Sequence, residues 1–263
     1  MIKITSKDNA LIKHIMKLKE KKYRNEYDEY LIEGIKLVKE AIDENINIKN
    51  IIISEEAVNS ELFEKKLKEK LQNREYTIVQ NSIFKLISDV EKPQGAIAII
   101  KKREKDGKID FSKDVILALD GIQDPGNLGT IIRTADSCNV TQILLSKGTV
   151  DCYNSKVIRS TMGAIFRVKI IECENLEKTL KEIKENNFKI IVTDLNSKKN
   201  IYNINYEKSV IVIGNEANGI SKNIIDLADE KVIIPMIGKT ESLNASVATG
   251  VILYEYARQK MNY

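Results

Sequence analysis

The second half of the chain alternates short apolar runs with longer amphipathic stretches, and this alternation constrains the fold more than any other feature. Strand-like runs are VILALD (115–120), QILLS (142–146), RVKIIE (167–172), KIIVTDL (189–195), SVIVIGNE (209–216) and KVIIPM (231–236). Helical patterns lie between most of them, at 128–138, 155–161, 176–186 and 221–227, and a last one starts at about 245. Uninterrupted β-branched runs are typical of strands that are buried on both faces of a sheet. The sequence therefore predicts an α/β fold with a mostly parallel sheet and helices on both faces.

The first hundred residues predict a smaller α/β unit that precedes this sheet. Apolar spacing indicates helices over 11–18, 31–42, 60–72 and 82–88, and strands over 48–53, 76–80 and 95–100. The charged segment KKREKDGKIDFSKD (101–114) then breaks the pattern, and it is typical of a linker. We therefore predict one domain over 1–104, a linker over 105–114 and a second domain over 115–263. An exposed loop within one domain is the alternative.

The composition excludes several classes of protein. With 43% hydrophobic and 30% charged residues, the chain can bury a core and remain soluble. No segment approaches the roughly 20 uncharged apolar residues of a membrane helix, and the N-terminus lacks a secretory pattern. The three cysteines, Cys138, Cys152 and Cys173, are too few and too irregularly spaced for a disulfide framework or a zinc site. We expect a cytoplasmic protein without membrane association or a bound metal.

Positive charge is concentrated at the N-terminus. Residues 1–24 hold eight basic and two acidic side chains, so their net charge is +6, against +4 for the whole chain. Such a segment suits a polyanion, because phosphate contacts from lysine and arginine release counterions. A solvated lysine-rich helix is the alternative interpretation. The candidate residues for binding a polyanion such as a nucleic acid are Lys13, Lys17, Lys21, Lys22 and Arg24.

The residues that the second half lacks restrict its chemistry. His14 is the only histidine of the chain, so histidine triads, histidine bases and histidine metal ligands are excluded from the predicted second domain. The sequence contains neither a P-loop nor a GxGxxG loop. Any ligand of the parallel sheet must therefore be held by other loops.

The first strand-end segment that could bind a ligand is LALDGIQDPGNLGTIIRTADSCNV. We expect a helix to begin near Asn127, a residue type that is typical of an N-cap. Gly129 permits the close approach of another backbone, and Arg133 follows four residues later on the same helix face. A helix N-terminus with a nearby arginine is a natural phosphate site. An ordinary capped helix is the alternative.

Two further strand-end segments have the same character. In SVIVIGNEANGIS, Gly214 and Gly219 flank Glu216, whose carboxylate can bind a ribose hydroxyl or orient a catalytic cation, although an ordinary βα turn has similar residues. In KVIIPMIGKTESLNASVATGVILYEY, Pro235 predicts the end of a strand or a bend in it, which frees backbone groups to bind an adenine edge. The small residues that follow form a helix face on which the chain itself or a partner subunit can pack closely.

Together these segments resemble a known family. The patterns N-L-G-x-x-x-R at 127–133, I-G-N-E-x-x-G at 213–219 and I-P-M-x-G-x-x-x-S-L-N-x-S-x-A at 234–248 are similar, in order and spacing, to the three motifs of SpoU/TrmH RNA 2′-O-ribose methyltransferases of the SPOUT superfamily. The resemblance covers roughly residues 115–260. YLIEG at 30–34 and KPQG at 92–95 also resemble the substrate-binding domain that precedes the catalytic domain in many members.

The resemblance implies a catalytic domain with a deep trefoil knot, a homodimer formed through that domain, and S-adenosylmethionine as the methyl donor. By position in the motifs, the residues implied to bind this cofactor are Gly214, Asn215, Glu216, Gly219, Ile234, Met236, Ser242 and Leu243. Thr193 and Leu195, with Asp194 between them, are expected to line the same pocket from the end of the preceding strand.

The resemblance also implies the catalytic residues. Arg133 matches the residue that is assigned to activate the ribose 2′-hydroxyl. Because a guanidinium stays protonated and is a poor base, we expect Arg133 to orient the hydroxyl, to contact RNA and to stabilise developing alkoxide charge. Asn127 and Glu216 are expected to position Arg133 and the ribose, and Ser242 and Asn244 to complete the pocket.

The substrate is less constrained than the reaction. A separate recognition domain and a basic N-terminus favour 23S ribosomal RNA as the substrate. The alternatives are a transfer-RNA ribose methyltransferase, a catalytically silent RNA-binding protein of ribosome assembly, and a knotted enzyme that methylates a base.

Overall fold

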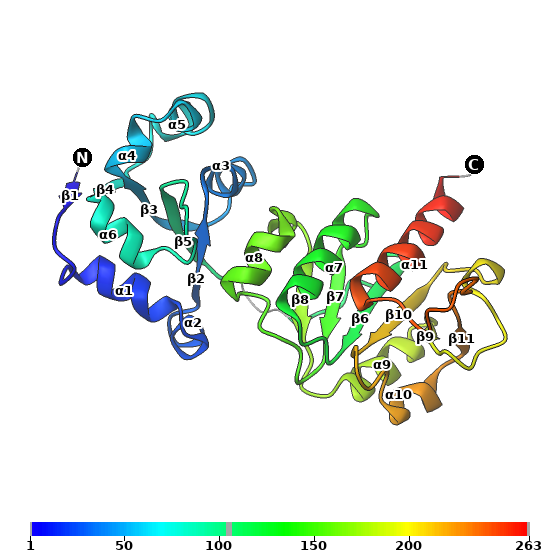
Figure 1. Cartoon of the computed structure of the whole chain (residues 1–263). Coiled ribbons are helices and arrows are strands. Elements are labelled where there is room, and N and C mark those ends of the chain that lie inside the picture. Colours follow the sequence, from blue (N-terminus) through cyan, green and yellow to red (C-terminus); the bar gives the residue numbers. More distant parts are fainter. Residues whose placement is uncertain (1, 104–106, 262–263) are drawn as a thin grey trace. The chain divides into compact units, whose positions relative to one another are not determined.

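The chain forms two compact units in the computed structural model, which describes residues 2–103 and 107–261. The N-terminal unit comprises Met1–Glu104 and Tyr153–Phe166, and the C-terminal unit comprises Lys105–Cys152 and Arg167–Tyr263. Both units are mixed α/β structures, so the predicted fold class is confirmed (Figure 1). Among the described residues, no helix combines the length and the apolar character that crossing a membrane requires.

The N-terminal unit is built on a five-stranded mixed sheet in the order β1-β4-β3-β5-β2. Its strands are β1 (Ile2–Ile4), β2 (Glu29–Glu33), β3 (Ile48–Ser54), β4 (Thr77–Val79) and β5 (Ala96–Lys101). Its helices are α1 (Ala10–Leu18), α2 (Lys21–Tyr27), α3 (Ile35–Asp43), α4 (Glu55–Val58), α5 (Glu61–Lys66), α6 (Asn81–Ile87) and α8 (Ser155–Thr161), with short 3₁₀ turns η1 (Glu69–Leu71) and η2 (Ala164–Phe166). Strands β3 and β5 pair antiparallel, as do β5 and β2.

Two predicted helices of this unit are wrong in part. The apolar pattern over 31–42 contains strand β2 and helix α3, which are separated at Gly34 with its positive φ of 115°. The burial of β2 alternates along the strand, with Tyr30 and Ile32 inside, so its period is two. The pattern over 60–72 breaks at Leu67 into α5 and η1. Apolar spacing over a short run does not separate a strand from the helix that follows it.

Residues Tyr153–Phe166 belong to the N-terminal unit although both neighbouring segments belong to the C-terminal unit. The ring of Tyr153 packs on that of Tyr30, with a centroid distance of 4.5 Å. The ammonium of Lys102 lies 4.9 Å from the centroid of the same ring. The sequence pattern predicts helix α8 but assigns it to the second domain. Contacts with β2 leave no periodic signal in the sequence, so the pattern could not show that α8 belongs to the N-terminal unit.

The C-terminal unit contains a six-stranded sheet in the order β11-β9-β10-β6-β7-β8, and all its pairs are parallel. Its strands are β6 (Val115–Asp120), β7 (Gln142–Leu145), β8 (Lys169–Glu172), β9 (Lys189–Thr193), β10 (Ser209–Gly214) and β11 (Glu230–Val232). Its helices are α7 (Pro125–Ser137), α9 (Leu176–Glu185), α10 (Lys222–Leu227) and α11 (Ala245–Lys260), with one 3₁₀ turn η3 (Ile201–Asn203). The predicted run 231–236 forms a strand only to Val232, and Pro235 lies in the following loop.

Helices cover both faces of this sheet (Figure 1). Alternate strand residues, such as Ala118, Val192 and Val212, form one buried cluster with apolar side chains of α9 and α10. In Figure 1, α7 and α11 lie on the other side of the sheet. Strands that pack on both faces need continuous apolar runs, which is the pattern that the sequence contains.

The predicted linker 105–114 differs from the structure in its second half. Residues 105 and 106 lie outside the described residues. Ile109 and Phe111 pack against the buried cluster of the C-terminal unit, and the ring of Phe111 lies 5.8 Å from that of Phe188. The two apolar side chains therefore tie residues 109–111 to the C-terminal unit.

The prediction that Arg24 binds RNA is corrected by its position. Arg24 is 5% exposed, and its guanidinium donates hydrogen bonds to the carbonyl oxygens of Leu18 and Lys19 at the end of α1. A helix leaves its last carbonyl groups without intrahelical partners, and a buried arginine can satisfy them. Arg24 therefore fixes the corner between α1 and α2.

We expect Arg24→Met to lower the free energy of unfolding by about 2–3 kcal/mol, because two charge-assisted hydrogen bonds are lost and carbonyl groups stay buried. The neighbouring exposed substitution Lys21→Met should change it by no more than about 0.5 kcal/mol. Urea unfolding followed by circular dichroism measures both. Equal stabilities of the two variants would show that the corner does not depend on Arg24.

Candidate active site

The three motif segments meet because strands β6, β10 and β9 are parallel neighbours. Parallel strands end at the same edge of a sheet, so the loops that follow them converge there. Gly214 at the end of β10 is opposite Asp120 at the end of β6. Thr193 ends the adjacent strand β9. The loops after these strands carry most of the residues that the sequence assigns to the site.

Helix α7 begins three residues earlier than predicted. Its N-cap is Asp124, whose carboxylate accepts a hydrogen bond from the backbone N–H of Asn127 at 2.8 Å, and Pro125 occupies the first turn. An acidic N-cap followed by proline is a favourable helix start, so the segment Asp124-Pro125 contained the signal. The side chain of Asn127 is therefore not used as a cap and is available for other contacts.

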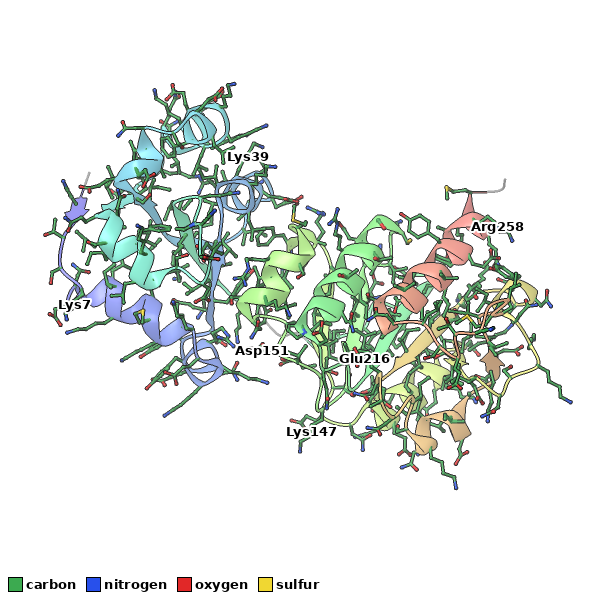
Figure 2. All side chains as sticks on the ribbon, viewed as in Figure 1. Lys7, Lys39, Lys147, Asp151, Glu216 and Arg258 are labelled. Carbon is green, nitrogen blue, oxygen red and sulfur yellow. The ribbon has the colours of Figure 1, made fainter. Side chains whose placement is uncertain are left out.

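Three amide and carboxylate side chains join the three motifs. Asn127 donates from Nδ2 to Oε1 of Glu216 at 2.6 Å. Asn244 donates from Nδ2 to Oδ1 of Asn127 at 3.0 Å. The Oδ1 of Asn244 accepts from the backbone N–H of Ser246 and caps helix α11. Each side chain orients the next, so the two amides have defined donor and acceptor ends. Glu216 is labelled in Figure 2.

The loop after β10 is held rigidly on the end of β6. Asn215 and Gly219 exchange two backbone hydrogen bonds, each of 2.9 Å. Nδ2 of Asn215 donates to the carbonyl oxygen of Gly121 at 2.7 Å, and Asp120 accepts from the backbone N–H of Ser221 at 2.8 Å. This role of Asp120 was not predicted from the sequence, although an acidic residue at the end of a buried strand was a visible signal.

Gly214 is required by close backbone packing. A Cβ atom at this position would lie 2.3–2.5 Å from backbone atoms of Gly219 and Ile220. The end of a flexible side chain could move away from such a Cβ atom, but these backbone atoms cannot. Any larger residue at 214 must therefore displace the loop that closes over the end of β10.

All ten residues predicted to bind the cofactor line one cavity of about 380 Å³. The apolar part of its wall includes Leu195, Ile213, Ile234, Met236 and Leu243. Its polar part comes from the motif loops, and it includes Glu216 and Ser242. Seven further lining residues, which only complete the wall, were not predicted from the sequence, and these are Ile213, Ala217, Asn218, Val232, Ile233, Ala245 and Ala248.

A cavity of this size and mixed lining fits a nucleoside with a short charged tail, because ligand pockets combine apolar walls with a few oriented polar groups. The apolar residues can contact a planar base, and the carboxylate and hydroxyl groups can bind a ribose or an amino group. The residues present therefore fit an adenosyl cofactor.

Arg133 lies on α7 with its side chain exposed. Within the described residues, no hydrogen bond or ion pair of its guanidinium is found, whereas Gly129 one turn earlier is buried. Asn127 and Glu216 bind each other, and among the described residues neither makes a hydrogen bond or ion pair with Arg133, so their expected role in positioning it stays a prediction. The guanidinium is therefore available to a substrate.

Comparison with known proteins extends the assignment to the whole chain. Residues 114–254 match the SpoU rRNA Methylase family, and residues 9–98 match the MRM3-like substrate binding domain. The chain is 31% identical over 256 residues to the 23S rRNA (guanosine(2553)-2′-O)-methyltransferase RlmP of Bacillus subtilis, covering 97% of this chain and 98% of that protein.

Solved structures agree with this match. An AdoMet-bound rRNA methyltransferase from Sinorhizobium meliloti is similar with a TM-score of 0.85 and 29% identity, and 98% of each chain is covered. An RNA 2′-O ribose methyltransferase is similar with a TM-score of 0.84 and 28% identity, covering 99% of this chain and 100% of that one.

The motif residues that meet at the sheet edge lie within the matched segment, and both units of the chain are covered. The prediction of an S-adenosylmethionine-dependent RNA 2′-O-methyltransferase is thereby confirmed, and the chain belongs to the SpoU rRNA methylase family.

Proposed function

We propose that this chain methylates the 2′-hydroxyl of a ribose in 23S ribosomal RNA. The observation that carries the proposal is the likeness to RlmP, which extends over 97% of the chain and so includes the N-terminal unit as well as the motifs. A transfer-RNA substrate is the competing candidate, and the full-length likeness to RlmP favours the ribosomal one.

The chain's own residues must align the hydroxyl, exclude water and stabilise the charge that develops on the oxygen. S-adenosylmethionine supplies a sulfonium methyl group when it is bound. Arg133 is exposed on α7 and has no partner within the described residues, so it can donate to the ribose oxygen or to the neighbouring phosphate. Donation to the oxygen lowers the cost of its developing negative charge.

Asn127, Glu216, Ser242 and Asn244 have a supporting role in this proposal. The two amides hold Glu216 in a fixed orientation at the cavity, where its second oxygen can accept from a ribose or amino group. Ser242 adds a hydroxyl group to the same wall. Preorganised groups of this kind need little rearrangement during the reaction.

The proposed cofactor residues share the single cavity at the sheet edge, which supports their common role. Asn215 and Gly219 shape the loop that closes one side of it. For RNA, we propose contacts with Arg133 and with Lys13, Lys17, Lys21 and Lys22, all four of which are exposed on α1 and α2.

We also propose a homodimer formed through the C-terminal unit. Val247, Tyr254 and Met261 follow each other at intervals of seven residues, and 51%, 56% and 54% of each is exposed. Side chains seven apart lie on one face of a helix, so they form an exposed apolar stripe along α11. Such a stripe is typical of a surface that a partner covers.

The knot is a further proposal. Strand β11 lies at the sheet edge beyond β9, whereas α11, which follows it, packs on α7 and β10. The chain must therefore return across the end of the sheet after residue 232. In an experimental structure, a chain path that straightens when both ends are pulled would contradict a knot.

We place the enzyme in the cytoplasm, which is consistent with its three free, buried cysteines.

Gly214→Ala should abolish cofactor binding, because its methyl group would overlap the backbone of Gly219 and Ile220. Gly250→Ala is the matched control, since a Cβ there meets only the methyl group of Thr134, at an ordinary contact distance of 3.9 Å. Isothermal titration calorimetry with S-adenosylmethionine measures both variants. Normal affinity in Gly214→Ala would remove this loop from the cofactor site.

Arg133→Ala should lower methyl transfer by about a hundredfold or more, as expected when a group that stabilises developing negative charge is removed, while cofactor affinity stays unchanged. Lys181→Ala, on the exposed face of α9, should leave the rate unchanged. Ribose methylation of 23S rRNA, mapped by resistance to alkali in a deletion strain complemented with each variant, measures the activity. Restored methylation with Arg133→Ala would contradict its role, and an unchanged 23S pattern in the deletion strain would contradict the substrate.

Val247→Asp should convert the dimer to a monomer, because a carboxylate would have to be buried in the apolar stripe. Leu86→Asp on α6 is the control, since Leu86 is also an exposed apolar residue at 46%. Sedimentation velocity measures the assembly state. A wild-type monomer, or a dimer that is unaffected by Val247→Asp, would exclude this interface.

A further inference from the structure

Two ammonium groups lie over an aromatic ring at the corner of α1 and α2, and the three motifs assign this cluster no role. Tyr23 is half-buried on α2. The Nζ atoms of Lys17 and Lys22 lie 5.5 Å and 5.4 Å from the centroid of its ring. Both lysines are exposed. We call Tyr23, Lys17 and Lys22 the Tyr23 platform.

The ring of Tyr23 is held in place by neighbouring aromatic rings. Tyr27 lies one helical turn further and is nearly parallel to Tyr23, with a centroid distance of 6.3 Å and an interplanar angle of 14°. The ring of His14 contacts Tyr27 edge-on at 4.8 Å, and its Nε2 lies 2.6 Å from a carboxylate oxygen of Glu29. Arg24 fixes the corner through the end of α1. The ring is therefore oriented before any ligand binds.

Such an arrangement matches the chemistry of a nucleotide. An aromatic side chain stacks on the face of any base, and ammonium groups beside it can bind the phosphates on either side of that base. The face of a base is accessible only where the base is unpaired or turned out of a helix. A base-paired duplex would offer phosphates to the lysines but no face to the ring.

We propose that the Tyr23 platform binds one unpaired nucleotide of the RNA substrate, with its base stacked on Tyr23 and its flanking phosphates held by Lys17 and Lys22. This inference rests on the proposed function, since it concerns recognition of the RNA that the enzyme methylates. The lysine contacts depend on charge, whereas the stacking contact with Tyr23 does not.

The chain contains no tryptophan, which makes a direct test possible. Tyr23→Trp introduces a single indole, and stacking with a base should quench its fluorescence. We expect saturable quenching by a short single-stranded RNA oligonucleotide and little by the same oligonucleotide annealed to its complement. Tyr202→Trp is the control, because Tyr202 is 53% exposed in the C-terminal unit and outside the platform. Equal quenching of the two variants, or equal quenching by strand and duplex, would overturn the proposal.

Affinity for transcribed 23S rRNA separates stacking from charge. Tyr23→Ala should weaken binding about five- to a hundredfold at every salt concentration, and Tyr23→Phe should restore it. Lys17→Ala with Lys22→Ala should instead reduce the slope of log affinity against log salt by about 1.4, which is the loss of two single-strand phosphate contacts. Thermal unfolding of each variant identifies any effect on folding. A Tyr23→Ala variant that folds and binds as the wild type does would overturn the proposal.

The two proposals fail in different ways. If the wild-type enzyme transfers no methyl group to 23S rRNA, the proposed substrate is wrong. If the wild type methylates this RNA and Tyr23→Ala does so with an unchanged KM, the platform alone is wrong. A raised KM with an unchanged kcat is the expected result, because Tyr23 acts in binding and not on the reacting atoms.

Discussion

The parallel pairing of β6 with β10 is the constraint on which the active site depends. Six residue pairs, from Ser209 opposite Val115 to Gly214 opposite Asp120, set these strands in register. Both strands therefore end at the same level, and their loops can reach each other. Hydrogen bonds from the backbone N–H of Ser221 to Asp120 and from the side chain of Asn215 to the carbonyl oxygen of Gly121 then fix the loop after β10 on the end of β6. Without this register, the motif residues would not share one cavity.

The polar side chains at this edge divide into two kinds. Asn127, Asn244 and Glu216 bind one another and join three segments that are far apart in the chain. Their bonds hold the site in shape before any ligand arrives. Arg133 makes no hydrogen bond or ion pair within the described residues and is exposed to solvent. This division suits the proposed methyl transfer, in which preorganised groups define the geometry and Arg133 would be the cation that meets the substrate.

The two units would contribute different physical terms to the proposed recognition of RNA. In that proposal, the exposed lysines of α1 and α2 supply charge, and electrostatic attraction of this kind weakens as salt rises. Phosphate contacts of this kind carry no information about sequence or structure. Stacking on Tyr23 would add a preference for unpaired nucleotides, and the cavity of the C-terminal unit supplies the chemistry. Specificity therefore requires more than the basic segment that is visible in the sequence.

The sequence by itself determined the parallel α/β sheet and the polar strand-end loops, because continuous β-branched runs and the polar residues at their ends are local patterns. Its resemblance to the family motifs named ten of the residues that line the cavity at the sheet edge. Only the tertiary structure decided that Arg24 is buried, that helix α8 belongs to the N-terminal unit, and that Asn127 binds Glu216 rather than capping α7. The physical reason is that burial and hydrogen-bond partners are set by segments distant in sequence, such as the 89 positions that separate Asn127 from Glu216.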